Sequence, residues 1–380
     1  MNIVAIYPVG SADTTDGIST KPVVDFIVES LTANSIEPHI ISPRLVSGDE
    51  PSLQEGRITI ENGGAVTFPF SLKSGGTRPR GLGLIRLWWW LIKTILANTK
   101  PGERVIVYHS MRYIVPVYLL QLFGRIRVVL YVGEFFQTLY PMRRWKRRLE
   151  KNYIKGADAY ILVTQLLVDQ VEQLRTKPFD YAVLYGPYVR EQSLVQEKEY
   201  VEIIRLLYVG KISKDKGIER TLQLAQYLDD RFEIRILGYC ESYDEEFLRT
   251  TIAESNATHR CKITFDGLKH GIEYKMYVQS CNLGLVLQDM DASYNANSFP
   301  SKILSFISNG LEVLAPAIPT IATSPLAHSL YLYEDEAPEA IAQTIRDIDF
   351  TQKRSNPVVL DNLKNTFIEE LRSLIKSQQT

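Results

Sequence analysis

The sequence has few cysteines: only Cys240, Cys261 and Cys281, all in its second half. Their spacing matches neither a zinc-ligand pattern nor a redox pair, and each lies in an apolar or strand-like stretch, so we expect them to pack as small hydrophobic residues. No apolar run approaches the roughly 18 uncharged residues that a membrane-spanning helix needs. The first residues also lack the basic leader of a signal peptide. We therefore expect a cytoplasmic protein.

Net charge is nearly absent as well, at −1 over 380 residues. This balance conceals an asymmetry, because residues 1–190 carry a net charge of +7 and the remainder −8. The two halves are therefore expected to meet different partners. No RNA- or DNA-binding motif accompanies the basic residues, so nucleic acid is not expected to be among those partners. The Gly-x-Gly-x-x-Gly of a nicotinamide-binding Rossmann enzyme is missing after every candidate strand.

The sequence does contain short apolar segments that alternate with helix-length periodic segments, which is typical of parallel α/β layers. Its length suits two such domains. The predicted strands are Asn2–Tyr7, Glu37–Ile41, Val105–Tyr108, Arg127–Tyr131, Ala159–Val163, Ala182–Tyr185, Arg205–Val209, Phe232–Leu237, Lys262–Phe265, Leu283–Leu287 and Val313–Ala315. The predicted helices include Lys21–Ala33, Trp145–Lys155, Gly217–Leu228, Tyr243–Ser255, Gly271–Gln279 and Ser301–Ser308.

Polar and proline-containing segments divide this series. The segment Gly186–Tyr200 predicts a linker, so we expect an N-terminal domain over residues 1–186 and a C-terminal domain over 187–356. A break near Pro357 precedes a last segment, 357–380, with a helix predicted at Asp361–Lys376 that could pack back on the first domain. Residues 44–81 are rich in Gly, Pro, Ser and Thr and predict a long surface insertion.

The strongest local signal lies where the first strand of the second half ends. In the run Leu207-Tyr-Val-Gly-Lys-Ile-Ser-Lys-Asp-Lys-Gly217, Gly210 permits a turn, and Lys211 and Lys216 stand between a strand and a helix. Open parallel sheets bind ligands at this end of their strands, and a helix N-terminus adds amide donors that suit phosphate. The alternative is an ordinary solvated loop with two lysines.

This run resembles the G-[RK]-x-x-x-x-K-G signature of the retaining GT-B glycosyltransferases (family 4-like, or group 1), which include sucrose synthase and many bacterial α-glycosyltransferases. The resemblance implies a GT-B fold, with two Rossmann-like domains facing across a cleft. It also implies that Lys211 and Lys216 hold the donor diphosphate and neutralise charge on the leaving nucleoside diphosphate. Lys211 stands where arginine is usual. A lysine ammonium is a point charge and cannot form the two parallel hydrogen bonds that an arginine makes with a phosphate.

Further segments follow the order of this family. Ile234–Tyr239 resembles its strand-then-glycine loop, and Ile263–Leu268 resembles the strand whose exit loop lies by the nucleobase. Asn297–Gly310 resembles the Pro-Ser-Lys variant of the Glu-x7-Glu element, whose helix N-terminus points at the diphosphate. The implied donor-binding residues of these segments are Gly238, Tyr239, Asp266, Gly267, Leu268, Ser301, Lys302, Ile303 and Ser305.

Three positions depart from the pattern. Ser305 replaces the glutamate that grips the donor ribose, Asn297 falls at the earlier acidic position, and Glu312 replaces the proline before the last strand. A serine hydroxyl can bond a ribose hydroxyl, but without charge assistance the bond is about half as strong. Ser305 and Asn297 favour an alternative, a non-catalytic GT-B subunit that binds a partner enzyme or a glycan, whereas the retained Lys211, Lys216 and Lys302 oppose it.

The first half holds the residues that the resemblance assigns to the acceptor side. Gly17 follows the first strand and resembles the glycine of the family's donor-phosphate loop. His109 and Glu134 each end a predicted strand, where relatives place a histidine or an acidic residue. We predict catalytic or acceptor contacts for His109 and Glu134, with ordinary polar surface residues as the alternative.

Two segments of the first half could meet a membrane. Arg143, Arg144, Arg147 and Arg148 belong to a basic run that puts one helix face in reach of anionic headgroups or of a lipid-pyrophosphate acceptor. Trp89 lies in a helical segment that carries three tryptophans with Arg86, Lys93 and Lys100, a composition that suits a lipid interface. The alternatives are a solvated basic face and a core helix.

The sequence therefore predicts a hexosyltransferase-type glycosyltransferase (EC 2.4) with a UDP- or GDP-linked sugar donor. We expect the acceptor to be a glycan, lipid-linked at the inner membrane face, in surface polysaccharide biosynthesis. By the resemblance the mechanism is retaining, with the leaving phosphate helping to deprotonate the acceptor. Neither a cofactor nor a metal is expected, and Asp289 and Asp291 are interpreted as ordinary loop residues.

Overall fold

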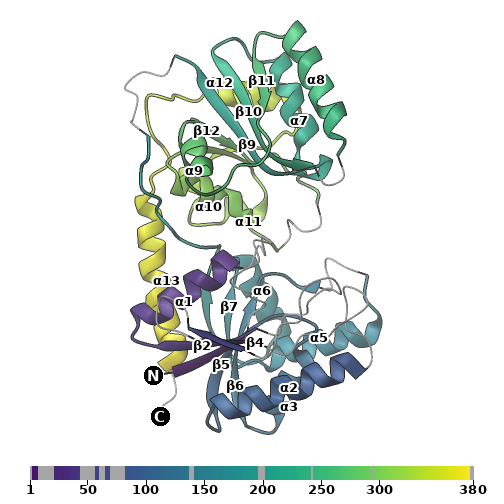
Figure 1. Cartoon of the computed structure of the whole chain (residues 1–380), viewed down its shortest axis with the longest axis vertical. Coiled ribbons are helices and arrows are strands. Elements are labelled where there is room, and N and C mark those ends of the chain that lie inside the picture. The colour runs from purple at the N-terminus through teal and green to yellow at the C-terminus, as the bar shows by residue number, and fades with distance from the viewer. Residues whose placement is uncertain are drawn as a thin grey trace. The chain divides into compact units, whose positions relative to one another are not determined.

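The computed structural model describes residues 2–6, 21–42, 56–59, 65–68, 82–136, 141–195, 202–240, 243–292, 295 and 297–376. The chain forms two compact α/β units (Figure 1). Unit 1 runs to Pro187 and includes the chain from Asn365 on, and unit 2 is Tyr188–Lys364. Within the described ranges, every helix is too short or too polar to cross a membrane.

Unit 1 is built on an eight-stranded sheet of order β3-β4-β2-β1-β5-β6-β7-β8. All neighbouring strands are parallel except β3 and β4, which pair antiparallel. The strands are β1 Asn2–Ile6, β2 Glu37–Ile41, β3 Gly56–Thr59, β4 Ala65–Phe68, β5 Glu103–Tyr108, β6 Ile126–Val132, β7 Ala159–Leu162 and β8 Asp180–Val183. The central strands are apolar throughout because helices cover both faces of a parallel sheet.

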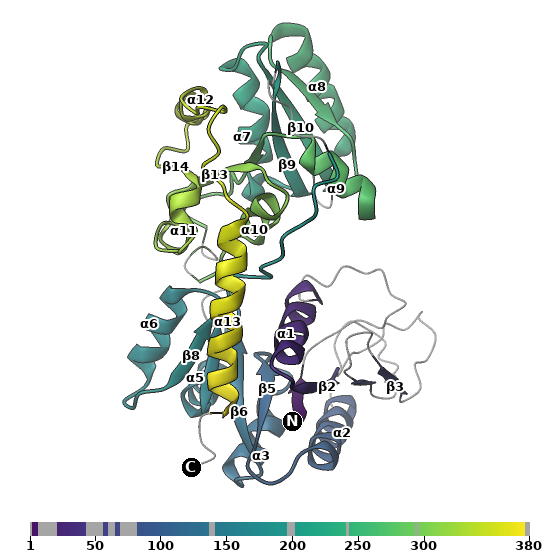
Figure 2. The same cartoon turned by 90° about the vertical axis from the view of Figure 1, so that its left-hand side faces the viewer.

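The helices of unit 1 are α1 Lys21–Ala33, α2 Leu82–Asn98, α3 Ile114–Leu122, α5 Arg144–Gly156 and α6 Gln165–Leu174. The last helix, α13 Val358–Lys376, joins this unit from Asn365 onward and lies beside α1 (Figure 2). Phe367 of α13 packs on Phe26 of α1 with ring centroids 5.7 Å apart. The side-chain amide of Asn34 donates to the carbonyl of Ile368 at 3.0 Å.

The segment 44–81, predicted as a surface insertion, contributes β3 and β4 to the sheet of unit 1, two strands that the sequence did not predict. β4 pairs with β2 from His39↔Ala65 to Ile41↔Thr67 and extends the sheet at its edge. Each of these strands has only four residues, which is too short to show a hydrophobic period, and the surrounding Gly and Ser residues are typical of loops.

Unit 2 has a six-stranded, fully parallel sheet of order β11-β10-β9-β12-β13-β14. Its strands are β9 Ile204–Ile212, β10 Phe232–Cys240, β11 Lys262–Phe265, β12 Leu283–Leu285, β13 Glu312–Pro316 and β14 Tyr331–Tyr333. Its helices are α7 Ile218–Gln223, α8 Glu245–Thr258, α9 Gly271–Gln279, α10 Ser301–Ser308, α11 Pro319–Ala322 and α12 Pro338–Arg346, with short 3₁₀ turns η1 Lys214–Lys216, η2 Leu224–Gln226 and η4 Ala327–Ser329. The fold predicted from the sequence, with two parallel α/β layers, is confirmed.

Two local differences matter for the site. β9 and β10 run beyond the predicted ends because their pairing continues through Gly210↔Gly238 to Ile212↔Cys240. Lys211 therefore lies within a strand. The predicted helix Gly217–Leu228 is instead the short α7 followed by η2.

Candidate functional site

The turn between β9 and α7 is shaped by Gly217. This residue has φ of +82°, and a Cβ atom there would lie 1.9 Å from the carbonyl oxygen of Leu287. Only glycine fits that position, because any side chain would be strained and would overlap backbone. The close packing brings η1, with Lys216 at its end, against the chain that follows β12.

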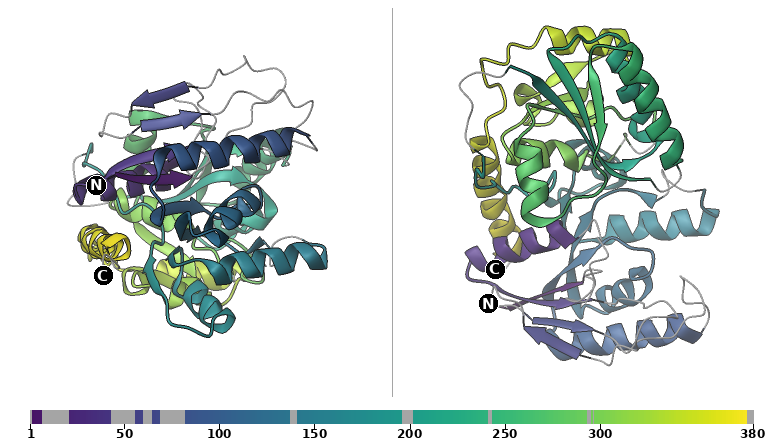
Figure 3. Two further views of the ribbon diagram at one scale, coloured as in Figure 1. Left: turned by 90° about the horizontal axis from the view of Figure 1, so that it is seen from below. Right: turned by 45° about the horizontal axis from the view of Figure 1, so that its top comes forward.

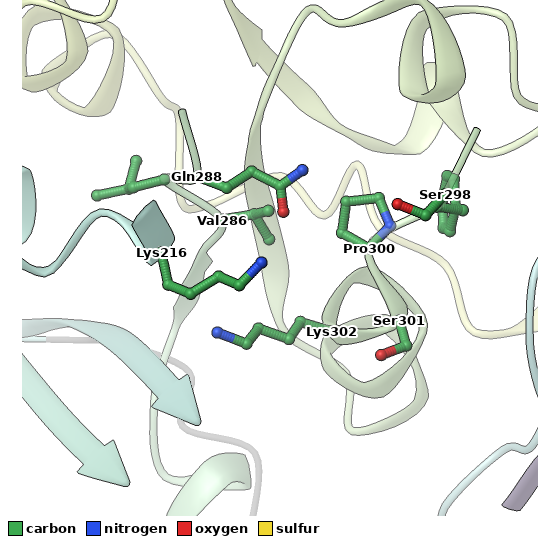
Figure 4. Close-up of a pocket in the computed structure, with 9 residues that line it drawn as sticks. Lys216, Val286, Gln288, Ser298, Pro300, Ser301 and Lys302 are labelled. Atoms are coloured by element: carbon green, nitrogen blue, oxygen red, sulfur yellow. The ribbon is translucent and has the colours of Figure 1, made fainter. Parts of the chain in front are cut away.

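Two lysines from separate elements line one cavity of about 240 Å³ in unit 2. Lys216 comes from η1, Lys302 comes from the first turn of α10, and both side chains extend into the same space (Figure 4). The remaining lining residues are Val286, Leu287, Gln288, Ser298, Phe299, Pro300 and Ser301. The cavity thus lies at the carboxyl ends of parallel strands, where open α/β sheets bind ligands.

The ammonium group of Lys302 lies 4.9 Å from the ring centroid of Tyr208 in β9. Among the residues that the structure describes, no carboxylate pairs with it. Burial and the positive charge of Lys216 lower the pKa of Lys302 to about 8, with Asp215 acting in the opposite direction. A cation held without an anion at this depth is stabilised by an anionic ligand.

Lys216 has a carboxylate neighbour, since its Nζ lies 3.7 Å from Oδ2 of Asp215. Burial lowers the pKa of Lys216. The positive charge of Lys211 also lowers it, whereas the negative charge of Asp215 raises it. Lys211 is outside the lining of the cavity, although its charge reaches Lys216. The structure therefore brings the three predicted lysines into one electrostatic group, with Lys216 and Lys302 at its centre.

The N-terminus of α10 adds backbone donors to these charges. Its N-cap residue, Pro300, has no side-chain oxygen that could accept from the first turn. Ser301 and Lys302, the first two residues of this helix, both line the cavity. A helix N-terminus carries partial positive charge and favours anions. Ile303 is buried in the core, and Ser305 is partly exposed in the second turn.

Because Gly210 and Gly238 have no side chains, β9 and β10 present only backbone atoms at these two positions beside the cavity. They are register partners, and a Cβ atom on Gly238 would lie 1.8 Å from the carbonyl oxygen of Gly210. A Cβ atom on Gly210 would lie 3.1 Å from Cε of Lys302. The lysine side chain therefore rests on bare backbone. Tyr239, which pairs with Lys211, is exposed at the strand end.

The predicted nucleobase loop follows β11 and is tied to β10. The amide of Gly238 donates to the carbonyl of Gly267 at 2.8 Å. Asp266 accepts from the hydroxyl group of Tyr277, and Leu268 is exposed. This loop lies at the same strand ends as Gly238, but its predicted contacts with a base stay predictions.

The three departures from the family pattern have different surroundings. Asn297 is buried. Glu312 is also buried, and both carboxylate oxygens accept the amide of Ser355, at 3.2 and 3.1 Å. Burial raises the pKa of Glu312 against the effect of these hydrogen bonds. Glu312 therefore anchors the chain just before α13, a role that a proline could not fill.

In unit 1, His109 is buried, with 3% of its surface exposed. Its Nδ1 atom lies 3.2 Å from the carbonyl oxygen of Glu134, and its Nε2 atom lies 3.5 Å from Oε1 of Glu150. Burial lowers the pKa of His109 to about 4, so the ring is neutral at pH 7. This geometry gives His109 a structural role in holding the loop after β6, and its predicted catalytic role stays a prediction.

Glu134 is partly exposed, and burial raises the pKa of its carboxyl group. Gly17 lies outside the described residues. Within the described ranges, no group of three or more His, Cys, Asp or Glu side chains is placed to hold a metal ion. The predicted membrane or acceptor residues, Arg143, Arg144, Arg147, Arg148 and Trp89, are all exposed.

Sequence reasoning missed several residues of the cavity. It also missed Tyr208, which is outside the cavity lining but contacts Lys302; Tyr208 lies two residues before Gly210, so strand alternation places both on the same face of β9. Gln288 lies three residues beyond the end of β12, at the edge of the sheet where ligands bind. The alternation in β9 and the position after β12 were therefore available signals. Ser298 lies in the segment Asn297–Gly310 that resembles the family element, but nothing singled it out within that segment.

No family model matches the chain, and no curated protein matches it. Solved structures do match over nearly its whole length. An E. coli trehalose-6-phosphate structure bound with UDP-2-fluoro glucose is 12% identical, with a TM-score of 0.65, and the match covers 98% of this chain and 97% of that one.

Two further matches have similar extent. Sucrose-phosphate synthase from Thermosynechococcus elongatus is 14% identical, with a TM-score of 0.62 and coverage of 98% and 94%. HepE of Anabaena in complex with UDP is 11% identical, with a TM-score of 0.64 and coverage of 99% and 98%. At such identities the likeness concerns the fold. The chain therefore has the GT-B fold of two Rossmann-like α/β domains, as the sequence resemblance predicts.

Proposed function

We propose that this protein is a glycosyltransferase that takes a sugar from a nucleoside-diphosphate donor, UDP- or GDP-linked. The observation that carries the proposal is the pair of ammonium groups, Lys216 and Lys302, that line one cavity with the N-terminus of α10. Cations and backbone amides in this arrangement suit a diphosphate. The proteins of similar fold that hold UDP or UDP-2-fluoro glucose support the choice of ligand.

Catalysis would rest on stabilising the leaving group. As the bond between the sugar and the diphosphate breaks, negative charge grows on the phosphate oxygen that leaves. In this proposal Lys216 and Lys302, which line the cavity, neutralise that charge together with Lys211. Electrostatic stabilisation of this kind supplies much of the rate enhancement of many enzymes. The family resemblance adds a retaining mechanism, in which the leaving phosphate helps to take the proton of the acceptor hydroxyl.

Release of free nucleotide tests this proposal directly. The purified protein is incubated with UDP- and GDP-sugars and a glycan acceptor, and liberated UDP or GDP is measured. Release above background supports the transferase, and Lys216→Ala should remove most of it. A thermal-shift panel of nucleotides and nucleotide sugars identifies the base. If no donor releases nucleotide although one binds, the second reading, a non-catalytic GT-B subunit, replaces the first.

That second reading is favoured by one observation, the neutral residues Ser305 and Asn297 at positions where the family has acidic groups. It makes a separate prediction about binding. A subunit that has lost only catalysis could still bind a nucleotide, because Lys216 and Lys302 remain. Binding and nucleotide release must therefore be measured on the same preparation.

We further propose that the acceptor is a lipid-linked glycan of surface polysaccharide biosynthesis and that unit 1 meets an anionic membrane. The support lies in α2, α3 and α5, with α3 packed between the other two (Figure 3, left). Large apolar side chains are exposed along them, including Trp89 at 71% and Phe123, just after α3, at 77%. The others are Ile85, Leu96, Leu119, Leu122 and Trp145.

The basic residues of these segments also favour an anionic membrane as the partner of unit 1. Residues 82–100, 112–127 and 143–156 hold thirteen Lys and Arg residues and one carboxylate, Glu150, which is fully buried. Basic residues beside exposed Trp and Phe side chains match the anionic headgroups and the interface of a bilayer. A solvated basic face would not need the aromatic side chains.

Vesicle sedimentation tests this part of the proposal. The protein should pellet with vesicles containing phosphatidylglycerol, far less with phosphatidylcholine alone, and less as salt rises. Replacing Arg144, Arg147 and Arg148 with Gln should weaken binding strongly. The matched control replaces Arg231, Arg249 and Arg260, which are exposed on unit 2, and should bind as the unmodified protein does. Equal loss in both variants would contradict a specific membrane face.

A further inference from the structure

Arg220 of α7 connects three segments around the cavity. Its Nη1 atom donates to the carbonyl of Leu287 at 2.6 Å, and its Nη2 atom pairs with Oδ1 of Asp289 at 3.1 Å. The same Nη2 atom lies 2.9 Å from Oε1 of Glu336, in the loop before α12. Only 15% of the arginine side chain is exposed. The three contacts of this guanidinium group thus hold the segment that follows β12 in place.

The segment that Arg220 holds forms one wall of the cavity. Leu287 and Gln288 line it, and Asp289 and Met290 follow directly. Glu336 accepts the amide of Met290 at 2.9 Å, so the carboxylate that pairs with Arg220 also holds this segment. The hydroxyl group of Tyr333 donates to the carbonyl of Val286 at 3.3 Å. The position of this wall is therefore determined by side chains that lie outside the cavity.

The carboxylate of Asp289 is close to the lysine cluster. The amide of Asp289 donates to the carbonyl of Asp215 at 3.4 Å, which puts the two residues side by side. Asp289 is also among the negative charges that act on Lys216. A carboxylate released at this point could turn to the ammonium of Lys216 and compete with an anionic ligand.

We propose that Arg220 is a positioning residue of the anion site, which holds the Leu287–Met290 wall and keeps the carboxylate of Asp289 from pairing with Lys216. The ammonium of Lys216 can then engage a diphosphate. This inference rests on the proposed function, because it takes the cavity to be a diphosphate site. It goes further by assigning a role to a residue outside the cavity and to the acid that it holds.

The test uses the whole chain and inorganic pyrophosphate as the probe, since pyrophosphate needs no knowledge of the base. Arg220→Met should weaken pyrophosphate binding about fivefold, the effect expected of one partly screened ion pair. Asp289→Asn placed in the Arg220→Met background should restore most of the affinity, because no carboxylate is left to compete. The matched control, Arg249→Met, breaks an exposed pair with Glu245 and should bind as the unmodified protein does.

The outcomes separate the inference from its alternatives. If Arg220→Met weakens binding and Asp289→Asn does not restore it, Arg220 only supports the fold and the inference is overturned. Unchanged binding in Arg220→Met overturns it as well. Arg220→Lys keeps a positive charge beside Asp289, so it should stay near the unmodified affinity even if the Met variant folds poorly; a loss equal to that of Met would contradict the charge argument. Absence of pyrophosphate and nucleotide binding in the unmodified protein would instead reject the proposed function.

Discussion

The side chain of Lys302 should make ligand affinity depend on pH. With a pKa of about 8, its ammonium is mostly protonated at pH 7 and mostly neutral at pH 9. A bound diphosphate favours the charged form and raises this pKa, so binding takes up a proton in that range. The variant Lys302→Met removes the titrating group and keeps much of its apolar stem.

The size of the effect follows from the protonated fractions. For a pKa near 8 the fraction falls from about nine tenths at pH 7 to about one tenth at pH 9, so affinity should fall about tenfold over this range. The stability of the ligand-free protein should change in the opposite direction. Because the pKa of Lys302 lies below its ordinary value of 10.5, its contribution to the free energy of unfolding rises as pH increases from about 8 to 10.5.

Calorimetric titration with UDP or GDP at pH 7, 8 and 9 measures the dependence. Titration of the ligand contributes equally to both proteins, so the difference between the unmodified protein and Lys302→Met isolates this lysine. The variant should bind more weakly at pH 7 and should lose much less affinity by pH 9. Equal slopes for the two proteins would refute the assignment of the low pKa to Lys302.

Three further predictions follow from the contacts of unit 2. Under the proposed function, Lys216→Ala should lower turnover by about tenfold to a thousandfold, the range for losing one charged transition-state contact, as measured by nucleotide release; a rate within twofold of that of the unmodified protein would contradict its role. Gly217→Ala should reduce the free energy of unfolding by more than about 2 kcal/mol, because a left-handed backbone and an overlap with Leu287 act together; an unchanged midpoint in urea would argue against this packing. Glu312→Ala should cost about 1 to 3 kcal/mol, since it leaves the buried amide of Ser355 without its acceptor, and a matched exposed change, Glu246→Ala, should be nearly neutral.

The fold was largely predictable because it depends on local patterns. Strands such as Lys262–Phe265 and Glu37–Ile41 were predicted with the observed bounds, since apolar runs bounded by turns identify buried parallel strands. The short strands β3, β4 and β14 were missed, because three or four residues are too few to show a hydrophobic period. Strand ends near Gly210 were also misplaced, since glycines usually end a strand and here two of them pair across neighbouring strands.

The site could be predicted only in part. The lysines at 211, 216 and 302 carry their signal in motif spacing, which survives in a single sequence. The contact of Lys302 with Tyr208 and the hold of Arg220 on Asp289 join residues that are far apart in the chain. No periodicity encodes such pairs, because they depend on how strands and helices stack. The ring of His109 was predicted from its place after a strand, but its burial and its contacts with Glu134 and Glu150 could not be read from the sequence.

The glycines at 210, 217 and 238 give a practical means of finding undiscovered relatives. Each is dictated by main-chain geometry rather than by ligand chemistry, so changes of donor or acceptor during evolution should leave them in place. We expect distant homologues to keep these spacings of seven and twenty-one residues even where Lys211, Lys216 and Lys302 have been exchanged. Chains that keep the glycines without the lysines would be candidates for descendants of the same scaffold that have lost the anion site.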